Sequence, residues 1–305
     1  MAVSDRWRGA ACALASTSFW AGNMVIARAF NASISPVSLA FLRWAVAVAA
    51  FAPFALKAVW AERALIKASA GRLALTGFLG ITLFNTFIYY AGRSTSAANM
   101  SLISIIFPIV IVALSRVVYG ERIAPRRGAG IAVVILGVLF LLSNGRPAGL
   151  LSLDFAAGDL LMLAAAVLFG SYSMFVRARP AGMSLKAFQF ATFAFGLALL
   201  APAFVYERVA GAPLKLDLAA AGAVLYVGLG ASLAAFLLWN KAIELVGAAT
   251  AGIVYYSMPA ISGLFAFVFL GEPLGVVHAV SFALIIGGIV LAGGSGAKKP
   301  AVAAN

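Results

Sequence analysis

Long apolar stretches alternate along this chain with short polar connections. A helix that crosses the hydrocarbon core of a bilayer needs about 20 mainly apolar residues, and the stretches have about that length. We therefore predict ten transmembrane helices, with connections short enough to make neighbours antiparallel. The predicted spans are 9–29, 36–58, 72–92, 96–119, 126–143, 156–178, 184–206, 219–241, 247–270 and 274–294.

Composition supports lipid rather than water as the solvent. Of the 305 residues, 64% are hydrophobic and only 10% are charged, against about a quarter charged in ordinary soluble domains. Water could not solvate a globule this apolar. The predicted class is an all-α, polytopic membrane protein. The first apolar stretch lacks a convincing cleavage site, so we expect it to be a retained anchor.

The net charge of +13 could suggest a nucleic-acid partner. The basic residues, however, lie in short loops between apolar stretches, which leaves no contiguous basic surface, so we expect no nucleic-acid binding. Most of the 22 Lys and Arg residues fall on one side of the ten-helix arrangement. Cytoplasmic loops are enriched in these residues, so both termini are predicted to lie in the cytoplasm, with the protein in the cell inner membrane. The opposite side holds only Arg28, Arg93, Arg146, Arg208 and Lys215.

Motifs for catalysis, cofactors and metals are missing. The single cysteine, Cys12, allows neither an intrachain disulfide nor a cysteine metal cluster. The phosphate-binding pattern GxxxxGK[ST], the zinc-protease pattern HExxH and the nucleophile elbow GxSxG are all absent. We expect neither an enzyme nor a cofactor.

The two halves of the chain align when one is displaced by about 150 residues, which indicates an internal repeat. The match of mid-helix prolines is the strongest sign, because the chain has only 11 prolines. We predict a first repeat of five helices at 1–148, a second at 149–297 and a cytoplasmic tail at 298–305. Because five is odd, the second repeat is inverted, an arrangement common in secondary transporters. The matching pairs include Gly77 and Gly228, Pro108 and Pro259, Glu121 and Glu272, Arg28 and Arg177, and Pro53 and Pro202.

Specific motifs open and close each half. The first helices of the two halves contain the motifs FWAGNMVIAR (19–28) and LFGSYSMFVR (168–177). The fourth helices contain FPIVIVALSRVVYGE (107–121) and MPAISGLFAFVFLGE (258–272). The chain resembles the EamA-type branch of the drug/metabolite transporter superfamily over nearly its whole length. The resemblance implies a ten-helix, five-plus-five fold and a central cavity lined by helices 1, 3, 4, 6, 8 and 9. It also implies export of small metabolites, and within the branch it points to amino-acid exporters, including those for aromatic amino acids.

Pro108 and Pro259 each free a backbone carbonyl one turn earlier, at Ser104 and Tyr255. Such prolines can be static kinks, which membrane helices tolerate. Their equivalent positions favour a pair of hinges, because rocking repeats must bend at matching places.

Polar and aromatic residues recur at three- and four-residue spacing on the third and eighth helices, so they share one face of each helix. The alternative is hydrogen bonding between helices. A cavity with such a lining suits a small solute with an apolar body and a polar end. Together with residues of helices 1, 4, 6 and 9, the candidate substrate-binding set is Trp20, Asn23, Phe78, Thr82, Asn85, Thr86, Tyr89, Asn99, Ser101, Ser104, Tyr172, Ser232, Phe236, Trp239, Asn240, Tyr255 and Tyr256.

Few charged groups fall inside the predicted spans, where they are costly and often functional. Arg43 is a candidate for a substrate carboxylate, with snorkelling or a structural pair as the alternative. Lys241 and Glu244 are expected to pair at the surface, and His278 is a weaker candidate for proton coupling. No Asp or Glu lies near the middle of a predicted span, so a carboxylate proton relay is not expected.

The sequence thus favours a secondary transporter that exports amino acids, aromatic ones included, by alternating access. Its expected partners are a small-molecule substrate and membrane lipid, and it is expected to be a monomer. Export of drugs or other amphipathic metabolites is the first alternative. A channel or a scaffold subunit is the alternative outside transporters.

Overall fold

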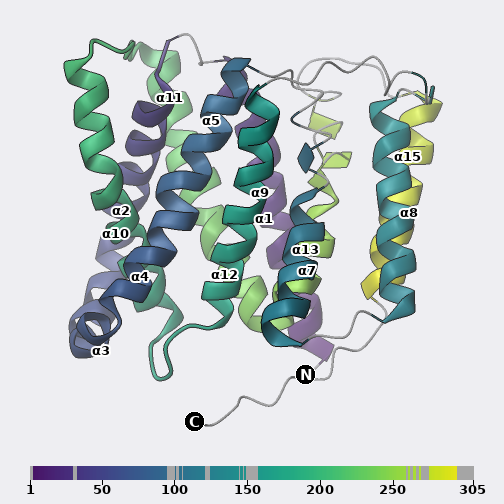
Figure 1. Ribbon diagram of the computed structural model, residues 1–305, viewed down its shortest axis with the longest axis horizontal. Coiled ribbons are helices and arrows are strands. Elements are labelled where there is room, and N and C mark those ends of the chain that lie inside the picture. Colours follow the sequence, from purple (N-terminus) through teal and green to yellow (C-terminus); the bar gives the residue numbers. More distant parts are fainter. Residues whose placement is uncertain are drawn as a thin grey trace.

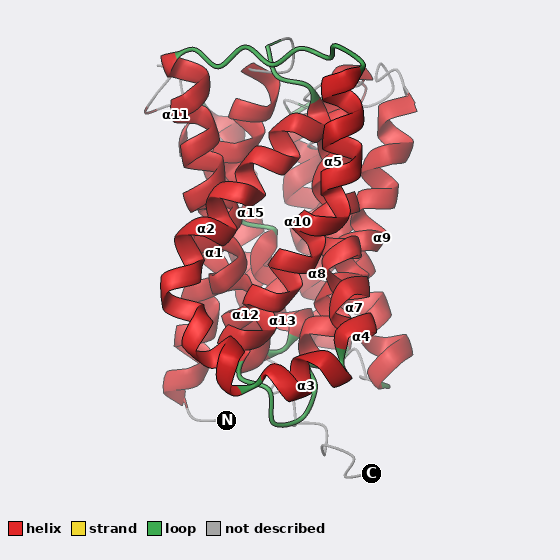
Figure 2. Ribbon diagram, turned by 90° about the vertical axis from the view of Figure 1, so that its left-hand side faces the viewer, coloured by secondary structure: helices red, strands yellow, loops and turns green. Residues whose placement is uncertain are grey.

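The computed structural model describes residues 3–29, 33–94, 100, 103–104, 106–120, 124–143, 145–146, 148, 157–258, 260–261, 264–265, 268 and 275–293. Within these residues the regular elements are helices, and residues 34 and 214 form an isolated bridge between two loops. Figures 1 and 2 show the helices standing side by side in one bundle, with the connections at the two ends of the helices. The predicted all-α class is confirmed.

The first half runs from α1 to α8. Its third span is continuous but changes type, from α4 through the π-helical stretch η1 to α5. A short helix, α3, lies between the second and third spans and was not expected from the sequence. The bounds are α1 (Val3–Ala29), α2 (Pro36–Ala61), α3 (Arg63–Ala68), α4 (Ala70–Gly77), η1 (Phe78–Leu83), α5 (Phe84–Ser94), α7 (Ile106–Tyr119) and α8 (Pro125–Leu142).

The second half has a similar order of helices in its described part, without a counterpart of α3 and again with a π-helical stretch in its third span. Five of the helical stretches in the described part are long and apolar enough to cross a membrane: 36–61, 70–94, 157–177, 185–209 and 218–246. Two more, 106–119 and 276–292, are shorter apolar helices. The second-half bounds are α9 (Ala157–Arg177), α10 (Leu185–Val209), α11 (Leu218–Tyr226), η3 (Val227–Ala234), α12 (Ala235–Val246), α13 (Ala248–Tyr255) and α15 (Val276–Gly293).

Each π-helical stretch packs against the second span of the other half, η1 against α10 and η3 against α2. A glycine makes each contact close. A Cβ on Gly77 would lie 2.8 Å from the Gly196 nitrogen, and one on Gly228 would lie 2.7 Å from Val46 Cβ. Both distances are shorter than real Cβ contacts. The close approach of the two halves therefore depends on these glycines having no side chain.

Helices α2 and α10 are joined at both ends by carboxylates. Glu207, near the end of α10, accepts from the backbone nitrogen of Ser38 at 2.9 Å and from the Ser35 hydroxyl at the start of α2. In turn Glu62, which follows α2, accepts from the backbone nitrogen of Ser184 at the start of α10, at 2.8 Å. A carboxylate at a helix N-terminus satisfies free N–H groups and complements the helix dipole. This antiparallel pair is therefore stabilised reciprocally.

Exposed aromatic side chains lie near the ends of the bundle. Trp7 is 73% exposed near the start of α1, Trp60 is 71% exposed near the end of α2, and Tyr206 is 74% exposed near the end of α10. Trp and Tyr are enriched where a membrane meets water. Their positions agree with helices that span the membrane along the vertical direction of Figure 1.

Candidate functional site

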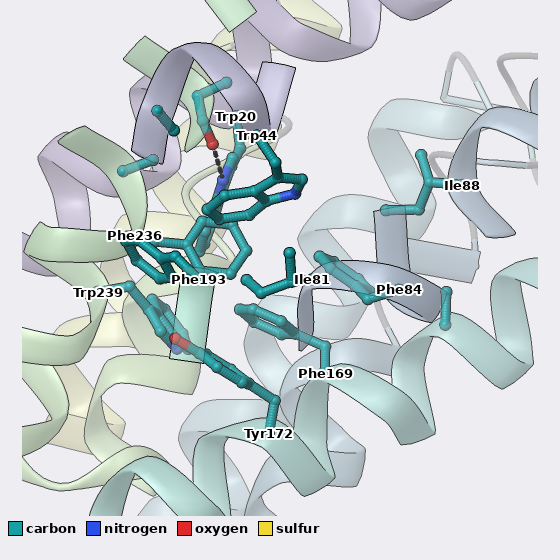
Figure 3. Close-up of a cluster of buried hydrophobic side chains, with 14 of the residues drawn as sticks. Trp20, Trp44, Ile81, Phe84, Ile88, Phe169, Tyr172, Phe193, Phe236 and Trp239 are labelled. Carbon is teal, nitrogen blue, oxygen red and sulfur yellow. Dashed lines mark hydrogen bonds between the residues drawn. The ribbon is translucent and has the colours of Figure 1, made fainter. Parts of the chain in front are cut away.

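A cluster of aromatic rings fills the centre of the bundle (Figure 3). The ring of Trp20 in α1 lies 5.3 Å from Phe169 in α9 and 5.4 Å from Trp239 in α12, measured between centroids. Phe236 and Tyr255 lie 5.6 and 6.0 Å from the same ring. Edge-to-face pairs such as Trp20–Phe169, at 86°, are favourable beyond their buried area. The cluster thus joins four helices, α1, α9, α12 and α13.

A small cavity of about 20 Å³ borders this cluster. That volume holds about one water molecule, so an amino acid does not fit without a rearrangement of the helices. The cavity is lined by Trp20, Asn23, Phe84, Asn85, Ile88 and Tyr255.

Arg43 of α2 is buried in a polar network beside the cluster, with 1% of its surface exposed. Its guanidinium donates to the Tyr89 hydroxyl and to Ser232 Oγ, both at 2.5 Å, and to the Ala231 carbonyl at 3.0 Å. Tyr89 in turn donates to Asn23 Oδ1 at 3.1 Å. Arg43 therefore does not snorkel to the membrane surface, and the network leads from α2 to a residue that lines the cavity.

A second polar pair lies on the other half of the bundle. Asn240 Nδ2 donates to the Tyr172 hydroxyl at 2.7 Å, which connects α12 to α9. In the repeat alignment Asn23 corresponds to Tyr172 and Tyr89 to Asn240. Both halves thus contain a Tyr–Asn hydrogen bond between their first and third spans, with the two residue types exchanged between the helices.

The π-helical stretches supply carbonyl acceptors to the site. The Ala231 carbonyl in η3 accepts from Trp20 Nε1 at 3.0 Å as well as from Arg43. Asn85 Nδ2 lies 3.2 Å from the Gly80 carbonyl in η1. Local π geometry releases carbonyls from the regular helix ladder and often marks functional sites.

The structure brings most of the predicted binding residues together, but not all. The Thr82 hydroxyl donates to the Gly196 carbonyl at 2.8 Å, and the Thr86 hydroxyl donates to the Thr82 carbonyl at 2.6 Å. Phe78 is 38% exposed, and Ser104 is buried. Tyr256 belongs to a separate apolar cluster with residues of α8 and α15. The residues buried in or beside the aromatic cluster and its polar pairs are Trp20, Asn23, Asn85, Tyr89, Tyr172, Ser232, Phe236, Trp239, Asn240 and Tyr255.

Some sequence-based expectations lie outside the described residues. These are Asn99, Ser101, Pro259, Glu121 and Glu272. Pro108 is described and buried, near the start of α7. Two residues before the position of Pro259, the ninth span is interrupted by a turn at Tyr256 and Ser257.

Sequence reasoning missed several apolar residues of the site. Phe169 corresponds to Trp20 in the repeat alignment, and Phe193 corresponds to Trp44. Trp44 and Phe193 contact each other, with ring centroids 4.8 Å apart. The repeat alignment was therefore a usable signal, because it pairs Trp44 with the residue whose ring it contacts.

The charged residues near the helix ends have local roles. Lys241 Nζ lies 2.5 Å from Glu244, as predicted, and Arg179 also pairs with Glu244 at 3.0 Å. His278 Nδ1 accepts from the Gly275 nitrogen at 3.2 Å at the exposed start of α15.

Comparison with known proteins identifies the class. A solved crystal structure superposes with a TM-score of 0.73, at 22% identity, over 96% of this chain and 97% of that one, so the two share a fold. The model of the EamA-like transporter family matches residues 7–143 and 156–294. The chain belongs to this family of membrane transporters, whose named relatives are transporters rather than enzymes.

Several relatives cover most of the chain, and two of them bear on its function. An uncharacterized transporter of Archaeoglobus fulgidus is 26% identical over 89% of this chain and 92% of its own length. A protein of Streptantibioticus cattleyicolor named as a probable terminal-alkyne amino-acid exporter is 29% identical over 72% of this chain and 71% of its own.

Proposed function

We propose that this protein is a secondary transporter that exports small metabolites, above all amino acids, aromatic ones included, across the cell inner membrane. The observation that carries the proposal is the buried aromatic cluster, which is bordered by a small cavity lined by aromatic rings and two asparagine amides. Such a lining suits a solute with an apolar body and a polar end. The relative named as an amino-acid exporter supports the same substrate class.

We further propose that transport proceeds by alternating access between two inverted five-helix repeats, 1–148 and 149–297, which make ten transmembrane helices. Three features support this. The family model matches two successive stretches. Both third spans contain a π-helical stretch, and Glu62 and Glu207 join α2 and α10 reciprocally. Matching bends at Pro108 and Pro259 remain part of this proposal, and the Lys and Arg distribution favours cytoplasmic termini.

Removal of aromatic surface at the site is expected to weaken transport. Trp239→Ala removes a fully buried ring that contacts Trp20, and Tyr89→Ala removes the link between Arg43 and Asn23. We expect the rate of L-phenylalanine transport by proteoliposomes, per folded molecule, to fall about two- to tenfold in each variant, since an aromatic contact is worth about 0.5–1.5 kcal/mol beyond its buried area.

The matched control is Tyr206→Ala, because Tyr206 is 74% exposed at the end of α10. Its rate should equal that of the wild type. Size-exclusion chromatography of each variant gives the folded fraction. Wild-type rates per folded molecule in both site variants would remove the aromatic cluster from the transport path. Transport of cationic drugs in preference to amino acids would favour the first alternative substrate class.

A further inference from the structure

Arg43 is a buried positive charge whose partners in the structure are neutral. The guanidinium is 1% exposed, and its acceptors are two hydroxyl oxygens and a carbonyl. Charged pairs do occur near the helix ends, where Glu244 is joined to Arg179 and Lys241. Burial of a charge inside a membrane protein is costly unless a counter-charge compensates it. Such a charge is therefore expected to meet an anion during the working cycle.

The next residue, Trp44, offers a second donor. Its side chain is fully buried, and within the described part of the chain Nε1 has no hydrogen-bond acceptor. The Arg43 guanidinium carbon lies 5.9 Å from the centroid of the Trp44 ring. In Figure 3 the Trp44 nitrogen lies on the side of the ring toward Phe84 and Ile88, which line the cavity. An unsatisfied buried N–H costs about 1–3 kcal/mol. A ligand that placed an acceptor beside this donor would therefore be stabilised by it.

Two side chains, Tyr89 and Asn23, connect the guanidinium to the cavity. The Tyr89 hydroxyl stands between Arg43, at 2.5 Å, and Asn23, at 3.1 Å, and Asn23 lines the cavity. A guanidinium has five N–H donors, and the three bonds described use three of them. A carboxylate that entered from the cavity could take the place of the Tyr89 hydroxyl and accept in the bidentate geometry that arginine favours.

We propose that Arg43, with the Trp44 indole N–H beside it, forms a subsite for the carboxylate of the transported molecule. This inference rests on the proposed function and narrows it, because the substrate must carry a carboxylate. The residue that corresponds to Arg43 in the second half is Thr192. The subsite therefore belongs to one half only, and the cavity binds one carboxylate.

Paired ligands that differ only in the carboxylate test the proposal. Isothermal titration calorimetry of the purified full chain in detergent compares L-phenylalanine with L-phenylalaninamide, and 3-phenylpropionate with 3-phenylpropanamide. We expect the wild type to bind each carboxylate about 10- to 100-fold more tightly than its amide, because hydrogen bonds to charged groups are the stronger ones. Arg43→Gln should lose this preference, and Arg43→Lys should keep part of it.

Arg127→Gln is the matched control. Arg127 is also a buried arginine, 6% exposed, but it lies at the start of α8. The Arg127→Gln variant should prefer carboxylates over amides as strongly as the wild type does. Equal binding of acid and amide by the wild type, no binding of either carboxylate, or a full preference in Arg43→Gln would overturn the proposal. The comparison of acids with amides in the wild type tests the carboxylate preference even if the Arg43 variants do not fold. Because binding is measured without transport, failure of the carboxylate preference and failure of the transport proposal are separate results.

Discussion

Gly77→Ala and Gly228→Ala are each expected to lower the thermal stability of the protein strongly. A methyl group on Gly77 would lie closer than 3.0 Å to the Thr192 carbonyl oxygen and 2.8 Å from the Gly196 nitrogen in α10. One on Gly228 would lie 2.7 Å from Val46 Cβ and 3.1 Å from the Arg43 carbonyl oxygen in α2. Overpacking of this kind costs about 1–3 kcal/mol, and more where backbone must move.

Two other glycines in the same spans provide matched controls. Neither Gly71 in α4 nor Gly222 in α11 would have any atom within 4 Å of an added Cβ. Alanine is favoured over glycine in a helix by about 1 kcal/mol, so Gly71→Ala and Gly222→Ala should leave stability unchanged or raise it. The measurement is the midpoint of thermal unfolding in detergent. Equal midpoints for all four variants would show that the contacts between η1 and α10 and between η3 and α2 are not close in the folded protein.

Tyr89→Phe and Tyr172→Phe are expected to shift the equilibrium between outward-open and inward-open states in opposite directions. The Asn23–Tyr89 bond lies near the ends of α1 and α5, and the Asn240–Tyr172 bond lies near the ends of α9 and α12. If the repeats are inverted, these bonds lie toward opposite faces of the membrane and act as an outer and an inner latch. Loss of one latch favours opening on its own side, and about 1.4 kcal/mol changes the ratio of states tenfold.

The shift can be measured with a cysteine at the cavity. The variant Ile88→Cys, in a Cys12→Ser background, places a thiol among the cavity-lining residues. A membrane-impermeant thiol reagent added outside the cell should label it faster with Tyr89→Phe and more slowly with Tyr172→Phe. The control Tyr206→Phe, at an exposed position, should leave the rate unchanged. Shifts in the same direction would contradict two latches on opposite faces.

The class of fold and the positions of the spans could be predicted from the sequence, because lipid imposes a simple rule of length and apolar content. The five long apolar helices overlap the predicted spans, with ends that differ by a few residues. The pairing of Lys241 with Glu244 was also predictable, since residues three apart on a helix are neighbours.

Features that depend on packing between distant helices could not be predicted. Glu207 lies just beyond the predicted seventh span, so its role at the start of α2 was invisible until the two helices were placed side by side. The π-helical stretches have no simple sequence signal. Phe84 and Ile88 line the cavity, but neither belongs to the polar and aromatic spacing that marked the third helix. Phe169, which contacts Trp20, could have been found from the repeat alignment alone.

Counterflow in proteoliposomes tests the central claim, that the protein is a carrier for amino acids, most directly. Vesicles that contain the wild-type protein are loaded with unlabelled L-phenylalanine and diluted into a trace of radiolabelled L-phenylalanine. A carrier that alternates its access accumulates label transiently, and uptake saturates with external substrate. We predict both transient accumulation and saturable uptake for the wild-type protein. We predict neither for protein-free vesicles. Passive equilibration of label that neither saturates nor depends on the internal amino acid would contradict the account and indicate a channel.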